Sequence, residues 1–347
     1  MARIITALLY PGQGPSSVFP GMAKEVLVKS PGATKVFYEA GRVLDKDMLS
    51  LCLYAPKEEL GLTENSQLAA LVMSLANAAV LREKGERALG DPRTCLAGNS
   101  VGIWAAVLEA QAISFEHTFQ CVQERARLMT EAARERPGKM MVGLHREDID
   151  IAAVEAMCTD KVRITNYNSP NQFLLGGPAD LVGEVARAIQ QEGLVARFIP
   201  FLSEGAWHSF CMEPVEEPFV EFLKGIPIKD PNHAIIGNQG QLITTADALR
   251  EELGHGPVRP VVWRRKYDAR EDGVIPTLQS MGVTRYLEVG AGEVLIDMLP
   301  SSSHKRRKIA GIVAVGILAV GGATSGVVLV KRQRRRMQRR QEKDQES

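Results

Sequence analysis

A serine between two glycines is the first feature of the sequence that could carry covalent chemistry. Residues 98–102 read Gly-Asn-Ser-Val-Gly, which matches the pattern G-x-S-x-G. In that pattern a sharp turn between a strand and a helix leaves room only for glycines and holds the serine at a strained, exposed position. The first N–H groups of the following helix can stabilise a developing oxyanion. The motif therefore predicts that Ser100 is a nucleophile, with a simple turn as the alternative.

A serine nucleophile needs a general base, and the chain has six histidines. His304 lies in a basic segment near the C-terminus, and His117 stands where a helix is expected to begin. His208, in the run SEGAWHS at 203–209, follows a predicted strand and a turn of small residues, a loop position typical of reacting groups. His208 is therefore the preferred base, and a purely structural histidine is the alternative.

The segments around Ser100 alternate between strand and helix patterns. Strands are predicted at residues 4–10 and 94–97, and helices at 66–84, 101–109 and 115–133. Such alternation is typical of an α/β domain with a largely parallel sheet covered by helices. We therefore expect a core domain formed by residues 1–137 and 200–300.

Residues 138–199 have a different pattern, which predicts a small inserted subdomain. Its strands are expected at 140–144, 162–167, 172–176 and 195–200, and its helices at 148–157 and 181–192. The order strand, helix, strand, strand, helix, strand is that of a ferredoxin-like unit.

The composition is that of a globular protein with an uneven distribution of charge. Hydrophobic residues make up 45% and charged residues 24% of the 347 residues, which excludes a disordered or low-complexity chain. Residues 301–347 carry a net charge of +9, and the first 300 residues carry −8. An acidic body lacks the basic footprint that nucleic acid requires, so no nucleic-acid partner is expected. The five cysteines form no C-x-x-C pair, so we expect reduced thiols and no metal site.

The C-terminal region contains a long uncharged segment, IAGIVAVGILAVGGATSGVVLV at 309–330. As a helix its 22 residues would span about 33 Å, close to the roughly 30 Å hydrocarbon core of a bilayer. A basic linker at 301–308 precedes it and a basic tail at 331–347 follows it. The pattern predicts a transmembrane helix that anchors the protein to a membrane, with residues 1–300 on the cytosolic side. A buried, glycine-rich helix is the alternative.

Further motifs accompany the serine motif along the chain. They are YPGQG at 10–14, T-x-N-x-Q at 63–67, RARLM at 125–129, NYNSPNQ at 166–172, WHS at 207–209, RPVVW at 259–263 and EVGAG at 288–292. In this order and spacing they resemble the motifs of malonyl-CoA:acyl-carrier-protein transacylases. The resemblance covers about residues 4–299. It implies a hydrolase-like α/β acyltransferase fold with an inserted ferredoxin-like subdomain.

The resemblance also implies a ping-pong malonyltransferase that requires no cofactor or metal. Ser100 would attack the thioester of malonyl-CoA with His208 as general base, and the malonyl group would then pass to the phosphopantetheine thiol of an acyl carrier protein. The backbone N–H groups of Gln13 and Val101 would form the oxyanion hole. A backbone carbonyl, expected at Asn238, would orient the histidine.

Arg125 is the residue that the resemblance assigns to the free carboxylate of the malonyl group. A bidentate arginine suits a carboxylate, which an acetyl group lacks, and a solvated helix arginine is the alternative. Met129 lies one turn further along the same predicted helix face. The acyl pocket and its supports would comprise Met129, Gln67, Asn168, Trp207 and Asn238. Met129 could equally be a core methionine, and Gln67 and Asn168 could equally be structural hydrogen-bonding residues.

The chain departs from the family's pattern around the nucleophile, and other functions stay open. Asn99 stands where the family usually has His, and Ile103 stands where an acid is common. These departures concern acyl preference and rate. The alternatives are the transacylase partner of a malonate decarboxylase, a thioester hydrolase and a membrane-tethered scaffold without catalysis. The retained nucleophile, base and arginine argue against the scaffold.

Overall fold

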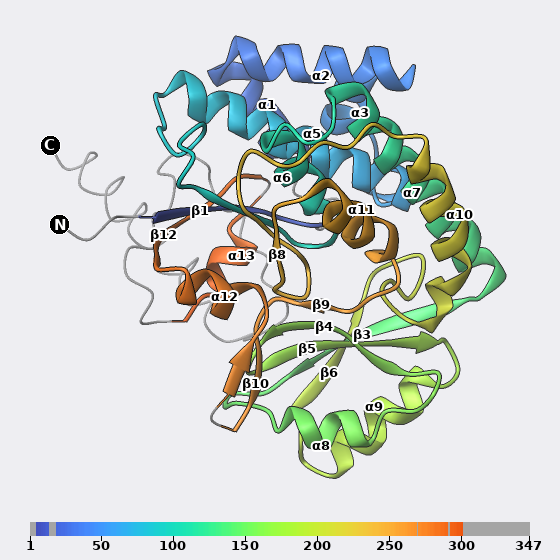
Figure 1. The fold of residues 1–347 in the computed structure, drawn as a ribbon. Helices are drawn as coiled ribbons and strands as arrows, with labels where there is room; N and C mark the ends of the chain where they lie inside the picture. Colours follow the sequence, from blue (N-terminus) through green and yellow to red (C-terminus); the bar gives the residue numbers. More distant parts are fainter. Residues whose placement is uncertain (1–4, 14–18, 269, 291, 301–347) are drawn as a thin grey trace, which may run out of the picture. The chain divides into compact units, whose positions relative to one another are not determined.

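The computed structural model describes residues 5–13, 19–268, 270–290 and 292–300, which belong to one compact unit (Figure 1). Its strands are β1 (Ile5–Tyr10), β2 (Cys95–Gly98), β3 (Gly138–Leu144), β4 (Arg163–Ser169), β5 (Gln172–Pro178), β6 (Arg197–Phe201), β7 (Ile235–Ile236), β8 (Leu242–Ile243), β9 (Val261–Val262), β10 (Arg265–Tyr267), β11 (Arg270–Asp272) and β12 (Val283–Glu288). Its helices are α1 (Phe19–Lys29), α2 (Pro31–Leu44), α3 (Met48–Tyr54), α4 (Lys57–Leu60), α5 (Thr63–Glu83), α6 (Ile103–Glu109), α7 (Phe115–Glu135), α8 (Ile151–Ala156), α9 (Val182–Gln191), α10 (Glu213–Lys224), α11 (Ala246–His255), α12 (Val274–Ser280) and α13 (Val294–Asp297).

The larger sheet has the strand order β12-β1-β2-β7-β8. Its first four strands run parallel, and β8 pairs antiparallel with β7. Along β1, Leu8 and Tyr10 join the hydrophobic cluster on one face, whereas Ala7 and Leu9 join the cluster on the other face. Both faces are therefore covered at β1, which explains why this strand is apolar at nearly every position rather than at alternate ones.

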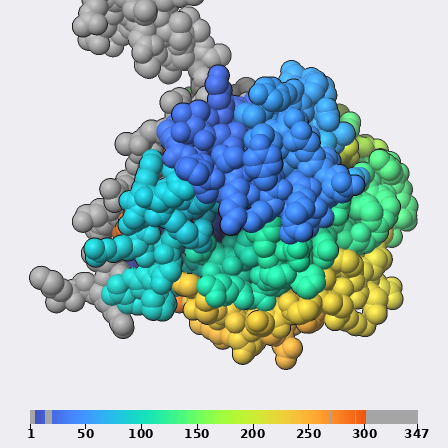
Figure 2. Space-filling view, turned by 90° about the horizontal axis from the view of Figure 1, so that it is seen from above, coloured from blue at the N-terminus to red at the C-terminus, as the bar shows by residue number. Residues whose placement is uncertain are grey.

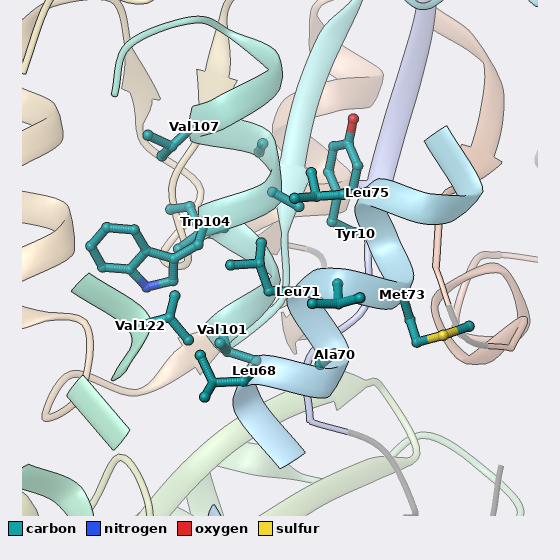
Figure 3. Packing of buried hydrophobic residues seen from close by; sticks show 14 of the residues in the cluster. Tyr10, Leu68, Ala70, Leu71, Met73, Leu75, Val101, Trp104, Val107 and Val122 are labelled. Atoms are coloured by element: carbon teal, nitrogen blue, oxygen red, sulfur yellow. The ribbon is translucent and has the colours of Figure 1, made fainter. Parts of the chain in front are cut away.

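Helix α5 forms the centre of the larger hydrophobic cluster. Most of its side chains are buried, and Leu68 and Leu71 lie near Val101 and Trp104 from the segment after β2 (Figure 3). A helix that is apolar on nearly every side has to be enclosed by other elements. The N-terminal helices α1 to α3 (blue) form much of the face shown in Figure 2, and α1, α2, α3 and α7 all contact α5.

The smaller sheet has the strand order β6-β3-β5-β4-β9. The first four strands pair antiparallel and, with α8 and α9, follow the predicted ferredoxin-like order. The helices α8 and α9 lie along one face of this sheet (Figure 1), and their apolar side chains form a separate cluster with those of β5. Strand β9 adds a parallel pairing to β4. The boundaries of the subdomain at 138 and 199 stay a prediction.

The predicted membrane helix requires a correction. The linker (301–308), the segment 309–330 and the tail (331–347) lie outside the described residues. Among the residues that the structure describes, no helix is both long and apolar enough to cross a membrane. The most apolar long helix, α5, is buried by protein instead. The fold class is therefore corrected to an α/β fold in which the described residues contain no transmembrane helix, and the membrane-anchored location and membrane partner inferred from that helix are not retained.

Candidate active site

Ser100 stands at a tight turn between β2 and α6. The turn continues as a short 3-10 helix, η2 (Ser100–Gly102), and Ser100 has a φ of +52°. A methyl group on Gly98 would lie 2.1 Å from the nitrogen of Ile103, and one on Gly102 would lie 2.2 Å from the carbonyl oxygen of Tyr10. Only glycine fits at these two positions, so the packing holds the serine in a conformation that a non-glycine residue rarely adopts.

His208 faces the nucleophile across 108 positions of sequence. Its Nε2 lies 2.8 Å from Ser100 Oγ, and its Nδ1 lies 3.0 Å from the carbonyl oxygen of Arg259. A carbonyl oxygen can only accept a hydrogen bond, so Nδ1 carries the proton and Nε2 is free to accept the serine proton. The pair thus has the geometry of a nucleophile with its general base.

The histidine is held in its neutral form. Its side chain is 3% exposed, and burial, followed by the positive charge of Arg125, lowers the pKa of His208 to about 3. A neutral imidazole is the form that can take a proton from Ser100.

Arg125, on α7, lies in the same site. Its guanidinium donates to Ser100 Oγ at 3.2 Å and to the side-chain oxygen of Gln67. The side chain is 3% exposed, and burial lowers its pKa to about 10. Within the described part of the chain it forms no ion pair with an acid, whereas Arg127, two positions later, pairs with Glu124 and Glu131 at the surface. A buried cation without an anionic partner is costly, so Arg125 is suited to an anion supplied by a substrate.

Gln67 and Met129 support the arginine. The amide nitrogen of Gln67, on α5, lies 3.5 Å from Met129 Sδ, and its oxygen accepts from Arg125. Both side chains are buried. The helices α5 and α7 therefore bring these two residues to the site, and their role toward an acyl group stays a prediction.

The two residues predicted for the oxyanion hole lie at the turn. A methyl group on Gly12 would lie 2.7 Å from the carbonyl oxygen of Asn99, so the segment that contains Gln13 passes close to the serine turn. Val101 is buried in the first turn of η2, where N–H groups have no partner within the helix. Their role in binding an oxyanion stays a prediction.

Asn238 does not orient the histidine as expected. His208 Nδ1 faces the carbonyl of Arg259, and the carbonyl of Asn238 instead accepts the N–H of Val262 at 2.7 Å. The reason is the path of the chain after β7, which turns this carbonyl toward β9. The side chain of Asn238 still reaches the site, because its Oδ1 accepts the backbone N–H of Ser100 at 2.8 Å.

Asn168 and Trp207 have local partners. Asn168 donates to Gln172 of the same hairpin at 2.9 Å. Trp207 is buried directly before His208, and its ring lies against Gly205. The contact of Asn168 fits its structural alternative, and a role of either residue in the acyl pocket stays a prediction.

Sequence reasoning missed a buried acid beside the nucleophile, Glu252 on α11. Its Oε1 accepts the backbone N–H of Asn238 at 2.7 Å and the Asn238 amide at 3.0 Å, and its other oxygen accepts from Gln241. These bonds fix which way the Asn238 amide faces, so its oxygen points to the N–H of Ser100. No sequence motif surrounds Glu252, and only its burial in the folded chain, at 3% exposed, distinguishes it.

Glu252→Ala is expected to lower the free energy of unfolding by about 1–3 kcal/mol, because two buried donors of Asn238 lose their acceptor. Glu251→Ala, a change at an exposed neighbour that pairs with Arg259 at the surface, is the control, and a loss of less than about 1 kcal/mol is expected. Urea unfolding followed by circular dichroism measures both. Equal decreases in the free energy of unfolding of the two variants would show that Glu252 does not support the turn that carries Ser100.

The residues around Ser100 enclose a small pocket lined by Ser100, Ile103, Trp104, Arg125, Asn238, Glu252, Leu253 and Gly256. In the described ranges, no three His, Cys, Asp or Glu side chains are grouped so that they could hold a metal ion. The strained serine, the neutral histidine and the helix that follows the serine together have the arrangement expected of an α/β enzyme that works through an acyl-serine intermediate.

Comparison with known proteins identifies the family. Residues 8–255 match the family model described as the acyl transferase domain. The chain is 32% identical over 308 residues to the malonyl CoA-acyl carrier protein transacylase of Bacillus subtilis, covering 88% of this chain and 92% of that protein. It is 31% identical over 313 residues to a probable mitochondrial malonyl-CoA-acyl carrier protein transacylase of Drosophila melanogaster, covering 86% of this chain and 80% of that protein. The chain therefore belongs to the malonyl-CoA:acyl-carrier-protein transacylase family.

A solved structure agrees with this assignment. It holds a type II polyketide synthase acyl-carrier protein in complex with its malonyl-transacylase, and the similarity has a TM-score of 0.75 at 27% identity. It covers 85% of this chain and 92% of that chain.

Proposed function

We propose that this chain transfers the malonyl group of malonyl-CoA to the phosphopantetheine thiol of an acyl carrier protein, in fatty-acid or polyketide synthesis. Membership of the transacylase family, and the similarity to a transacylase that was solved with its carrier protein, support the substrate and the acceptor. The geometry around Ser100 supports an acyl-serine intermediate.

The first half of the reaction loads the serine. His208 Nε2 takes the proton of Ser100 Oγ, to which it lies at 2.8 Å, while Oγ attacks the thioester carbonyl carbon. The resulting oxyanion is stabilised by the N–H groups of Gln13 and Val101. When the tetrahedral intermediate collapses, the C–S bond breaks and the CoA sulfur takes the proton from His208, which leaves malonyl-Ser100.

The second half uses the same groups in reverse. The thiol of the carrier protein gives its proton to His208, and its sulfur attacks the malonyl ester. The C–O bond to Ser100 then breaks, and Oγ recovers the proton from His208. Enzyme and base return to their starting state, so the cycle consumes no additional reactant.

The malonyl specificity is argued from the surroundings of Arg125. This guanidinium is buried, touches Ser100 Oγ and has no ion pair with an acid of the described residues. A malonyl group on Ser100 would place its carboxylate close to this cation, whereas an acetyl group would leave the cation unpaired. Charge-assisted hydrogen bonds to a carboxylate are about twice as strong as neutral ones, so the site favours the malonyl group.

Intact-protein mass spectrometry of the full chain tests this function. Incubation with malonyl-CoA is expected to add one malonyl group, and Ser100→Ala is expected to show no adduct. Addition of a carrier protein with its phosphopantetheine arm should discharge the adduct and yield malonyl-carrier protein. A folded wild-type chain that forms no adduct contradicts the proposal, and discharge to free malonate without carrier protein assigns the chain as a hydrolase.

A further inference from the structure

Arg163 connects the smaller sheet to the loops that carry the reacting histidine. It is the first residue of β4, and its Nε donates to the carbonyl oxygen of His208 at 3.1 Å. A second nitrogen, Nη2, donates to the carbonyl oxygen of Val258. Its guanidinium also lies over the ring of Phe210, 4.2 Å from the centroid. One side chain therefore contacts three positions in two separate loops.

The two carbonyls that Arg163 binds flank the hydrogen bond between His208 Nδ1 and the carbonyl of Arg259. One belongs to His208 itself, and the other belongs to Val258, directly before Arg259, whose carbonyl accepts from His208 Nδ1 at 3.0 Å. The rigid fork of a guanidinium can bond both carbonyls at once. It thereby fixes the distance between the loop that carries the base and the loop that carries its hydrogen-bond acceptor.

The backbone of His208 needs such support. Its φ is +60°, in the left-handed region that residues with a side chain rarely occupy. The surrounding structure has to maintain a conformation of this kind. Besides Arg163, the carbonyl of Pro257 holds it by accepting the N–H of His208 at 3.2 Å.

The positive charge of Arg163 also affects the pKa of the His208 imidazole. Burial is the main cause that lowers the pKa of His208, and the positive charges of Arg125 and, to a smaller extent, Arg163 lower it further. The acids whose charges act on Arg163 are Glu213 and Glu216. These two acids pair with Arg136 and His255 respectively.

We infer that Arg163 is a positioning residue for the general base, through which the small subdomain holds His208 and the Arg259 carbonyl in register with Ser100. The inference rests on the proposed acyl transfer through Ser100 and His208. Nothing in the serine or histidine motifs assigns this residue, which lies three positions before the motif NYNSPNQ at 166–172.

Arg163→Met and Arg163→Lys in the full chain test the inference, with Arg187→Met as control. Arg187, on α9, donates to Gly183 of its own helix. The rate of malonyl-Ser100 formation is followed by quench-flow mass spectrometry against malonyl-CoA concentration and pH. Both Arg163 variants are expected to lose about 10- to 100-fold in kcat, with little change in KM, since a small displacement of the base slows the chemistry without removing substrate contacts. The control should keep the wild-type kcat.

The pH profile separates positioning from a general loss of structure. The base must be neutral, so the rate falls with decreasing pH as His208 becomes protonated. Arg163→Met removes a positive charge near the imidazole, so its half-maximal rate should move to higher pH. Arg163→Lys keeps the charge and should keep the wild-type pH profile despite its lower kcat.

A wild-type kcat in both Arg163 variants overturns the inference. An increase in KM without a decrease in kcat overturns it as well. Melting temperatures identify a variant that fails to fold, in which case Arg163→Lys alone decides the result. If the wild-type chain itself forms no malonyl adduct, the proposed function has failed. If the wild type is active and the variants match it, only the role of Arg163 has failed.

Discussion

Arg125→Ala is expected to reduce the acylation of Ser100 by malonyl-CoA about 30- to 4,000-fold and to abolish the preference for malonyl-CoA over acetyl-CoA. The guanidinium is buried, and it donates to Ser100 Oγ at 3.2 Å. Loss of one partner of a buried charge pair costs about 2–5 kcal/mol, and about 1.4 kcal/mol corresponds to a factor of ten. The acetyl group has no free carboxylate that Arg125 could bind, so the rate of Ser100 acylation by acetyl-CoA should change far less.

The ratio of kcat/KM for the two donors is the measurement that decides this prediction. Arg127→Ala is the matched control, because Arg127 lies on the same helix and pairs with Glu124 and Glu131 at the surface. The control should keep the wild-type ratio, since exposed ion pairs contribute about 1 kcal/mol or less. An unchanged ratio in Arg125→Ala would show that another group binds the malonyl carboxylate.

His208→Ala is expected to slow the formation of malonyl-Ser100 by a factor of about 100 to 10,000, the usual contribution of a positioned general base. Nε2 lies 2.8 Å from Ser100 Oγ, and no other histidine of the described residues is hydrogen-bonded to that oxygen. His117→Ala is the control, because His117 lies at the start of α7 and contacts Ser114 there. Single-turnover mass spectrometry measures all three proteins. If His208→Ala forms malonyl-Ser100 as fast as His117→Ala does, His208 is not the general base.

The same residue predicts the pH dependence of the wild-type enzyme. Burial and Arg125 lower the pKa of His208 to about 3. The base is therefore neutral across the range from about pH 5 to about pH 8, and the acylation rate should be nearly constant there. The rate should fall only as the pH approaches the lowered pKa from above. A decline centred near the ordinary histidine value of about 6.5 would contradict the environment described for this residue.

The sequence determined the parts of the protein that depend on neighbouring residues. The turn around Ser100 follows from the two glycines, whose α-carbons lie where no side chain fits. The predicted helices and strands agree with the observed ones to within three residues, for example 115–133 against Phe115–Glu135. Periodicity and turn chemistry act over a few positions, so they can be read directly from the chain. The helices α1 to α4, between residues 13 and 63, and the helices and strands after residue 209 lie in segments for which no elements are predicted from the sequence.

The tertiary structure decided which distant groups meet. Its loop position and the family resemblance single out His208 among the six histidines, but only the fold brings it to within hydrogen-bonding distance of Ser100. The carbonyl that orients it belongs to Arg259 rather than Asn238. Arg163 and Glu252 carry no sequence signal, because their importance arises from hydrogen bonds to residues 45 and 14 positions away. A local pattern fixes the conformation of a segment, but contacts between segments depend on how sheets and helices pack, which the pattern does not contain.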